Sequence, residues 1–492
     1  MSGDSASGIS RRQFLRGGAA ALAGLAGAIG GSAAGAADAP PVKGPIAGIE
    51  RYAGDESMNA NPRPQVVRNR LYVTLPRSLK PEEMPGLAKV ISDRAGVALE
   101  PLFREIYLPR QAEPLSLKQA FDVFPLRFAG KHKRMLMRHY AVSVMSGEDP
   151  DELLHRLREA ARTTLPRAQA VNALASNSGS GDYAPQPDCG APAMHLCPPF
   201  IDVQHARELA LDGPLGQHVA IRVIERVWKP QPGWRVIGRA LDQGNYRELA
   251  GEHRGAFDFD NDSHHAQMTH TTLFDATGYG MVPGAGFTPV TSMARDAAGR
   301  LVRNVAAGIL NAALTLRAGN VILIEEQRTG GNLPVETDLA VYDAIQWATA
   351  AGLTVVEPAG NGGQEVKLGN SGAILVAASL NSKGKPHQRY PGIDGSNGSN
   401  YGEGIHCHAV GDITLSDDGL FYTGTSAAAA QIAGVVALVQ SLYKAKHGTD
   451  RFLRPADMRK VLVENGTSAD GEFIGTMPDL PRIIRALELG PP

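Results

Sequence analysis

Apolar residues after about position 200 form short continuous runs separated by longer segments of helical spacing. The runs have the length of buried strands and occupy residues 219–224, 321–324, 353–356 and 373–378. Segments 305–316 and 337–352, which precede two of the runs, have the pattern of helices. Continuous apolar strands alternating with helices predict an α/β fold, with a mostly parallel sheet covered by helices on both faces. We expect this domain to span residues 201–492.

The region before it has a different pattern. Strand-like segments occupy 70–75, 96–103 and 139–145, and helix-like segments occupy 81–94 and 149–157. An order of strand, helix, strand, strand, helix and strand predicts a small ferredoxin-like α+β domain over residues 67–172. Residues 38–66 and 173–200 are predicted linkers. The second is rich in Asn, Ser, Gly and Pro, which is typical of an exposed segment open to proteolysis.

Residues 1–37 are predicted to be a twin-arginine signal peptide. Arg11 and Arg12 precede an apolar, glycine- and alanine-rich stretch that ends near Gly31, and residues 34–36 form a possible cleavage site. The stretch is only weakly hydrophobic, so we expect no stable membrane anchor. The predicted location is the periplasm or the exterior of the cell.

Composition removes one class of function and adds little else. The chain has 49 basic and 50 acidic side chains and a formal net charge of -1, which gives no electrostatic reason to bind nucleic acid. Cys189 and Cys197 are close enough in sequence for a local disulfide, and Cys407 is the odd cysteine. We expect no cofactor and no metal ligands, and the oligomeric state is not determined by the sequence.

Candidate chemistry lies at the ends of the predicted strands. Glu225 ends one strand, Asn361 follows another in a glycine-rich turn, and His264 lies between them in the sequence. Ser426, in the sequence Gly424-Thr425-Ser426, begins an apolar helix that would hold its hydroxyl rigidly. Acid, histidine, asparagine and serine, in this order, match one known arrangement of a catalytic triad with its oxyanion donor.

Three motifs make the chain similar to subtilisin-like serine peptidases from about residue 200 onward. They are Gly424-Thr425-Ser426, Ala359-Gly360-Asn361 and Val282-Pro283-Gly284-Ala285. The resemblance implies Ser426 as nucleophile, His264 as general base, Glu225 as the carboxylate that orients the histidine and Asn361 as oxyanion donor. The resemblance implies peptide or protein substrates and a possible calcium ion, whose ligands it does not name. It also implies that residues 67–172 correspond to the inhibitory propeptide of the family. A permanent accessory domain is the alternative for that segment.

The acid and histidine motifs depart from the family pattern. The family usually has Asp followed one residue later by Gly, where this chain has Glu225-Arg226-Val227, and His-Gly-Thr, where this chain has His264-His265-Ala266. His265 is therefore an alternative base. Two other functions stay open. One is a catalytically degenerate subtilase fold that binds peptides or acts as a scaffold; the other is an unrelated esterase, which the missing Gly-x-Ser-x-Gly motif disfavours.

One further motif, the acidic run 258–262, has the alternation of a calcium loop. Its sixth position is Ser263 and its twelfth is Thr269, where an EF-hand needs glycine and a bidentate acid. We therefore expect these acids to form a solvated turn before the histidine helix.

Overall fold

The structure is a computed structural model of the 492-residue chain. It describes residues 70–164, 171–173, 201–229 and 259–490, apart from short gaps within these ranges. Every described residue belongs to one compact unit within Ile49–Pro492. The predicted signal peptide, Cys189 and Cys197 lie outside the described residues, as do the predicted linkers except at residue 173.

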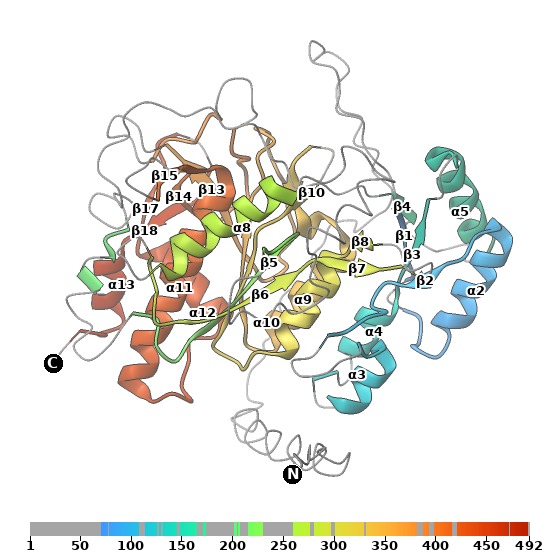
Figure 1. The fold of residues 1–492 in the computed structure, drawn as a ribbon, viewed down its shortest axis with the longest axis horizontal. Coiled ribbons are helices and arrows are strands. Elements are labelled where there is room, and N and C mark those ends of the chain that lie inside the picture. The colour runs from blue at the N-terminus through green and yellow to red at the C-terminus, as the bar shows by residue number, and fades with distance from the viewer. Residues whose placement is uncertain are drawn as a thin grey trace, which may run out of the picture. The chain divides into compact units, whose positions relative to one another are not determined.

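An eight-stranded sheet forms the centre of the region after residue 200 (Figure 1). Its order is β17-β18-β14-β13-β12-β9-β5-β6, and all neighbours are parallel except β17 and β18. The strands are β5 (Ala220–Glu225), β6 (Gly286–Thr291), β9 (Val321–Ile324), β12 (Thr354–Pro358), β13 (Ile374–Ser379), β14 (Cys407–Val410), β17 (Gly466–Ser468) and β18 (Thr476–Pro478). The predicted α/β fold class is confirmed.

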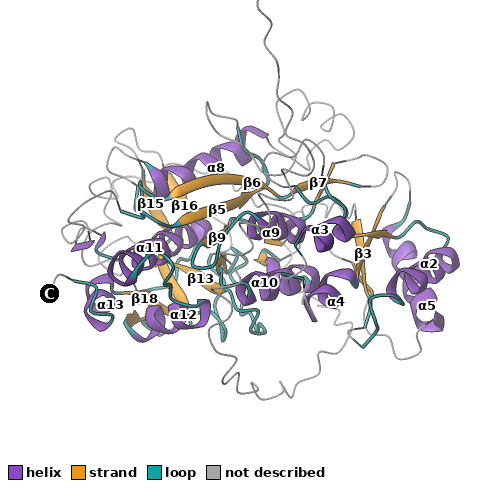
Figure 2. Cartoon of the chain, turned by 90° about the horizontal axis from the view of Figure 1, so that it is seen from below, coloured by secondary structure: helices purple, strands orange, loops and turns teal. Residues whose placement is uncertain are grey.

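Helices cover both faces of this sheet because successive strand residues point to opposite sides. In β9, Val321 and Leu323 pack toward α11, whereas Ile322 and Ile324 pack toward α9 and α10. In Figure 2, β9 and β13 lie between α11 and the pair α9 and α10. The helices of this region are α8 (Phe259–Phe274), α9 (Val305–Leu314), α10 (Leu339–Ala350), α11 (Gly424–His447), α12 (Pro455–Glu464) and α13 (Leu480–Ala486), with a 3₁₀ turn η2 (Val335–Thr337).

Helix α11 is the central helix of the core. Every residue from Gly424 to Ser441 is buried, and the run of small side chains at 427–430 lets the helix lie close to the sheet. It is the one helix among the described residues that is long and apolar enough to cross a bilayer, but 94% of its most apolar window is buried inside the protein. Its hydrophobicity is that of a core helix.

A separate four-stranded antiparallel sheet precedes this region. Its order is β2-β3-β1-β4, with β1 (Arg70–Thr74), β2 (Glu100–Pro101), β3 (His139–Ser143) and β4 (Val171–Ala173). The helices are α2 (Met84–Ala95), α3 (Leu117–Val123), α4 (Lys131–Met137) and α5 (Pro150–Thr164). Side chains of α2 and α5 share a core with β1 and β3. This is the predicted ferredoxin-like arrangement, with α3 and α4 added between β2 and β3.

Three two-stranded ribbons complete the described structure. They are β7 (Met293–Arg295) with β8 (Leu301–Arg303), β10 (Gln327–Arg328) with β11 (Leu333–Pro334), and β15 (Asp412–Thr414) with β16 (Phe421–Thr423). β16 runs directly into α11, so it brings Tyr422 to the same end of the sheet as Ser426.

Candidate active site

The site lies at the carboxyl ends of β5, β9 and β12, which are parallel and meet at one edge of the sheet. Glu225 is the last residue of β5 and is 3% exposed. Its carboxylate accepts hydrogen bonds from the Thr269 hydroxyl at 3.0 Å and from the ring of His265. The predicted strand-end carboxylate therefore faces inward and is held by helix α8.

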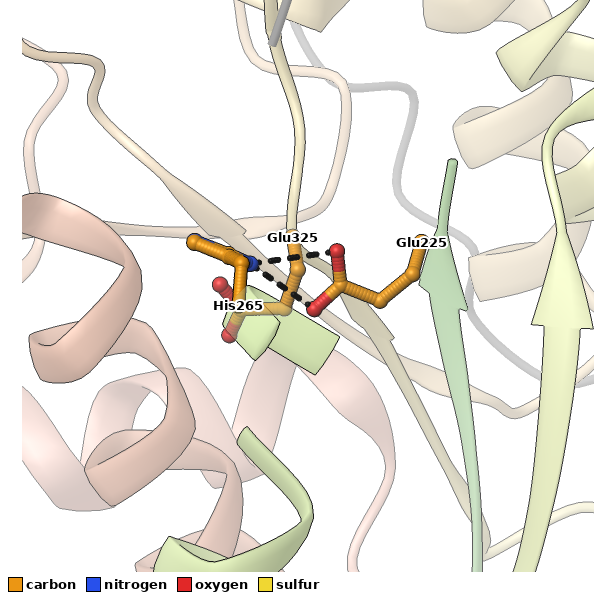
Figure 3. Close-up of side chains that lie close together, drawn as sticks. All are labelled: Glu225, His265 and Glu325. Atoms are coloured by element: carbon orange, nitrogen blue, oxygen red, sulfur yellow. Dashed lines mark hydrogen bonds and ion pairs between the residues drawn. The ribbon is translucent and has the colours of Figure 1, made fainter. Parts of the chain in front are cut away.

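His265 is the histidine that reaches Glu225. Its Nδ1 lies 3.1 Å from Oε1 and 3.2 Å from Oε2 of Glu225, as the dashed lines in Figure 3 mark. Its ring also packs edge-on against Tyr422, with 5.3 Å between the ring centres. His265 and Thr269 are four residues apart on α8 and so share the helix face that meets Glu225.

The predicted partner of Glu225 was His264, but in the structure the next residue, His265, lies against this carboxylate. His264 is exposed, because adjacent residues on an α-helix differ by about 100° around its axis. The prediction of a turn at 258–262 is also wrong in part: α8 already begins at Phe259, and Asp262 is buried and forms an ion pair with Arg226 at 3.1 Å. Asp258 lies outside the described residues.

Burial and mutual charge change the acidity of both partners. Burial raises the pKa of Glu225, while the nearby His265 charge and the hydrogen bonds from His265 and Thr269 oppose that rise. Burial lowers the pKa of His265, but the Glu225 charge, the hydrogen bond to it, and the charges of Asp262 and Glu326 outweigh burial and raise this pKa above its usual value. The pair is thus arranged to stabilise a protonated imidazole.

Ser426 is the third residue of α11, where the backbone N–H groups of the first turn have no partner within the helix. It is 8% exposed. Its hydroxyl lies close enough to the Glu325 carboxyl to influence the pKa of that group, and one Glu325 oxygen lies within 4.8 Å of a ring nitrogen of His265. The serine, the histidine and the two glutamates therefore form one cluster.

Asn361 follows β12 after a glycine with a positive φ of 88°, Gly360. Its side-chain oxygen accepts from the backbone N–H of Thr425 at 2.9 Å and from the Thr425 hydroxyl at 3.1 Å. Its backbone N–H donates to Gln327 Oε1 at 2.8 Å. Because the amide oxygen takes both Thr425 donors, the amide nitrogen is directed elsewhere and can donate to another acceptor.

Sequence reasoning missed three members of the cluster. Glu325 follows β9 directly and is buried, and its Oε2 forms a hydrogen bond with the Tyr422 hydroxyl, 3.1 Å between the two oxygens. Tyr422 in turn contacts Thr269, 2.7 Å between hydroxyl oxygens. The signal for Glu325 was present: two acids follow an apolar strand whose carboxyl end must lie beside that of β5. No local pattern marks Tyr422 or Thr269.

One group of side chains among the described residues could converge on a metal ion. Glu225, His265 and Glu325 each offer a ligand atom within 4.8 Å of the other two. The two carboxylates and the imidazole do not match a calcium site, because calcium takes about six to eight oxygen ligands. The possible calcium ion thus stays an expectation without ligands.

Comparison with known proteins identifies a family that part of the chain resembles. Residues 277–476 match the family model described as Subtilase family. The subtilase resemblance is confirmed over these residues. Asn361 and Ser426 lie inside the matched segment, whereas Glu225 and His265 precede it. A subtilisin-like protease of Coccidioides posadasii (strain C735) is 31% identical over 141 residues, which is 27% of this chain and 32% of that protein. The alignment thus spans about a third of that relative's length.

Solved subtilase structures also resemble this one. The epidermin leader peptide processing serine protease EpiP of Staphylococcus aureus is 14% identical, with a TM-score of 0.47, over 85% of this chain and 98% of that one. Fervidolysin of Fervidobacterium pennivorans, described as a keratinolytic enzyme related to subtilisin, is 15% identical, with a TM-score of 0.43, over 85% of this chain and 61% of that one.

Proposed function

We propose that this protein is an exported serine endopeptidase of the subtilisin type. The observation that carries the proposal is the hydrogen bond from His265 Nδ1 to Glu225 at the sheet edge where α11 begins. A hydrogen on Nδ1 leaves Nε2 as the free acceptor, which is the tautomer that a general base requires.

The reaction is an acyl transfer. Ser426 Oγ attacks the peptide carbonyl while His265 Nε2 takes its proton and then gives it to the leaving amine. Glu225 stabilises the imidazolium, in agreement with the raised pKa of His265. The Asn361 side chain and the Ser426 backbone N–H bind the oxyanion.

Substrate class and location follow from the same proposal. Peptides or proteins are the substrates, and the twin-arginine segment directs export to the periplasm or beyond. Residues 67–172 act as a propeptide that is removed by cleavage within 173–200. A permanent accessory domain would leave that linker intact in the mature protein, which N-terminal sequencing of the exported form distinguishes.

The proposal is tested with a serine-directed fluorophosphonate probe on the exported protein. We expect labelling of the wild type, no labelling of Ser426→Ala, and full labelling of the matched control Ser441→Ala on the same helix. His265→Ala is expected to slow labelling by ~10²–10⁴-fold, the typical contribution of a general base, whereas His264→Ala leaves the rate unchanged.

The competing hypothesis is a degenerate subtilase fold that binds extended peptides. It predicts an unlabelled wild type that still binds peptides. An esterase would label at Ser426 but hydrolyse esters without cleaving peptides. Labelling combined with peptide cleavage therefore supports only the first proposal.

A further inference from the structure

Glu325 is a third ionisable group beside the nucleophile. It is 2% exposed, and its Oε2 lies 3.1 Å from the Tyr422 hydroxyl oxygen, at hydrogen-bond distance. Its Oε1 is also buried and has no aligned hydrogen-bond partner within the described part of the chain. The Ser426 hydroxyl lies near this carboxyl, so Oε1 is an acceptor available to it.

A line of hydroxyl groups joins Glu325 to Glu225. The Tyr422 hydroxyl lies 3.1 Å from Glu325 Oε2 and 2.7 Å from Thr269 Oγ1, which lies 3.0 Å from Glu225 Oε1. All four residues are buried. A continuous chain of hydrogen-bond contacts through Tyr422 and Thr269 therefore connects the two carboxyl groups.

The number of contacts between Glu325, Tyr422, Thr269 and Glu225 determines how many protons these four side chains must share. Three contacts at hydrogen-bond distance need three protons, and the two hydroxyl groups supply only two. Thr269 Oγ1 also lies 3.3 Å from the backbone oxygen of His265, which adds to the demand for donors. The third proton must come from a carboxyl group.

The proton belongs to Glu325. The Nδ1–H of His265 donates to Glu225 and favours its ionised form. Burial, and then the Glu225 charge, raise the pKa of Glu325 well above its usual value, although the hydroxyls of Ser426 and Tyr422 oppose the rise. A neutral Glu325 can donate from Oε2 to Tyr422 and accept at Oε1.

We propose that Glu325, Tyr422 and Thr269 form a proton relay that carries the Ser426 proton to Glu225, in parallel with the route through His265. This inference rests on the proposed peptidase function. Glu325 faces the reacting hydroxyl and is a catalytic residue, whereas Tyr422 and Thr269 act through it.

Each step moves one proton and changes no oxidation state. The Ser426 O–H bond breaks as a bond forms between that proton and Glu325 Oε1, and Oε2 releases its own proton to Tyr422. Tyr422 passes its proton to Thr269, which passes its proton to Glu225 Oε1. The serine oxygen is then free to attack with its electron pair. The reverse sequence returns the proton to Ser426 when the acyl group leaves.

The relay is tested by measuring kcat in mixtures of H₂O and D₂O. We expect a curved dependence on the deuterium fraction in the wild type, because several protons move together. Tyr422→Phe and Thr269→Val should give a linear dependence and a kcat loss smaller than the ~10²–10⁴-fold of a lost general base, since the route through His265 remains. Thr269→Ser and the control Tyr443→Phe should keep the curvature.

The resting proton is tested separately by infrared spectroscopy at neutral pH. Glu325→Gln should remove a protonated-carboxyl band, whereas the control Glu365→Gln, at an exposed acid, should leave the protonated-carboxyl region of the spectrum unchanged. A spectrum unchanged by Glu325→Gln overturns the relay.

A wild type that labels at Ser426 but shows the same isotope dependence as Tyr422→Phe overturns the relay alone. A wild type that does not label overturns the peptidase function and the relay's catalytic role together, while the band still reports the proton on Glu325.

Discussion

A single residue step on α8 decides which histidine serves the site. His264 and His265 are chemically identical, and only the rotation of the helix turns one toward Glu225 and the other toward solvent. The pKa of the selected ring is then set by its surroundings: burial lowers it, but the Glu225 charge, the hydrogen bond to Glu225 and the charges of Asp262 and Glu326 together outweigh burial and raise it. The proposed function thus depends on the contact between His265 and Glu225, which the sequence around either residue does not specify.

The first prediction at this scale concerns pH. In the proposed mechanism the general base is neutral His265, so kcat/KM should rise with pH through the raised pKa of this group, at a midpoint above its usual value of 6.5. Glu225→Gln removes the charge that chiefly raises the pKa, so the midpoint should fall, with Asp262 and Glu326 as the remaining acids facing the ring. A pH-rate profile measures it.

The matched variant is Glu225→Asp, which keeps the charge and should keep the midpoint closer to that of the wild type. An identical midpoint in the Gln and wild-type proteins would contradict the assignment of Glu225 as the group that controls His265.

Among the elements of the fold, the start of α11 lies close to the turn after β12, with Gly424 beside Asn361. Gly424 has a positive φ of 80°, and a Cβ there would lie 2.9 Å from Asn361 Oδ1. The same amide oxygen accepts both Thr425 donors, so the first turn of the helix and the turn after β12 position each other. The glycine thus serves the geometry of the candidate oxyanion donor as well as the path of the chain.

Gly424→Ala should therefore cost both stability and activity. We expect a loss of about 1–3 kcal/mol in the free energy of unfolding from the strained φ. We also expect a kcat loss on the order of 10²-fold if the Asn361 amide moves by about 1 Å. Chemical denaturation and steady-state kinetics measure the two effects.

Gly448→Ala, at the other end of α11, is the control. Gly448 also has a positive φ, of 100°, but a Cβ there meets nothing within 4 Å. It should lose stability and keep kcat. Equal kcat in the two variants would mean that the contact with Asn361 has no catalytic consequence.

At the scale of the molecule, the ferredoxin-like part and the peptidase-like part share buried polar and apolar contacts. Asp343 of α10 is fully buried and accepts from Arg138 Nε at 2.8 Å and from the His139 ring at 3.0 Å. Phe128 stacks on Trp347 with 5.1 Å between ring centres. Buried contacts therefore join described residues of both parts.

Asp343→Asn should lower the free energy of unfolding by about 3–5 kcal/mol, because it removes the negative charge that pairs with the buried Arg138 guanidinium. Denaturant titration of the full chain measures the change. The matched control is Asp93→Asn, which removes the exposed ion pair with Lys89 and should change stability by about 1 kcal/mol or less. Equal effects would show that the ion pair at Asp343 contributes no more than a surface pair.

The sequence determined the main architecture and the places of three candidate site residues in it. Continuous apolar runs of strand length, such as 321–324, alternate with segments of helical spacing, and this alternation predicts a parallel sheet covered on both faces. Glu225 and Asn361 were placed correctly at strand ends because the carboxyl ends of parallel strands share an edge. The small residues that begin α11 likewise placed Ser426 where a rigid helix starts.

Only the tertiary structure decided what these residues touch. The rotation of α8 selected His265, and the parallel pairing of β5 with β9 placed Glu325 beside Glu225, which lies 100 positions earlier in the chain. Tyr422 and Thr269 joined the cluster through packing that no local pattern records. Strand and helix periodicities depend on neighbouring residues and can be read from the chain, whereas a hydrogen-bonded cluster depends on distances between segments that only the folded chain sets.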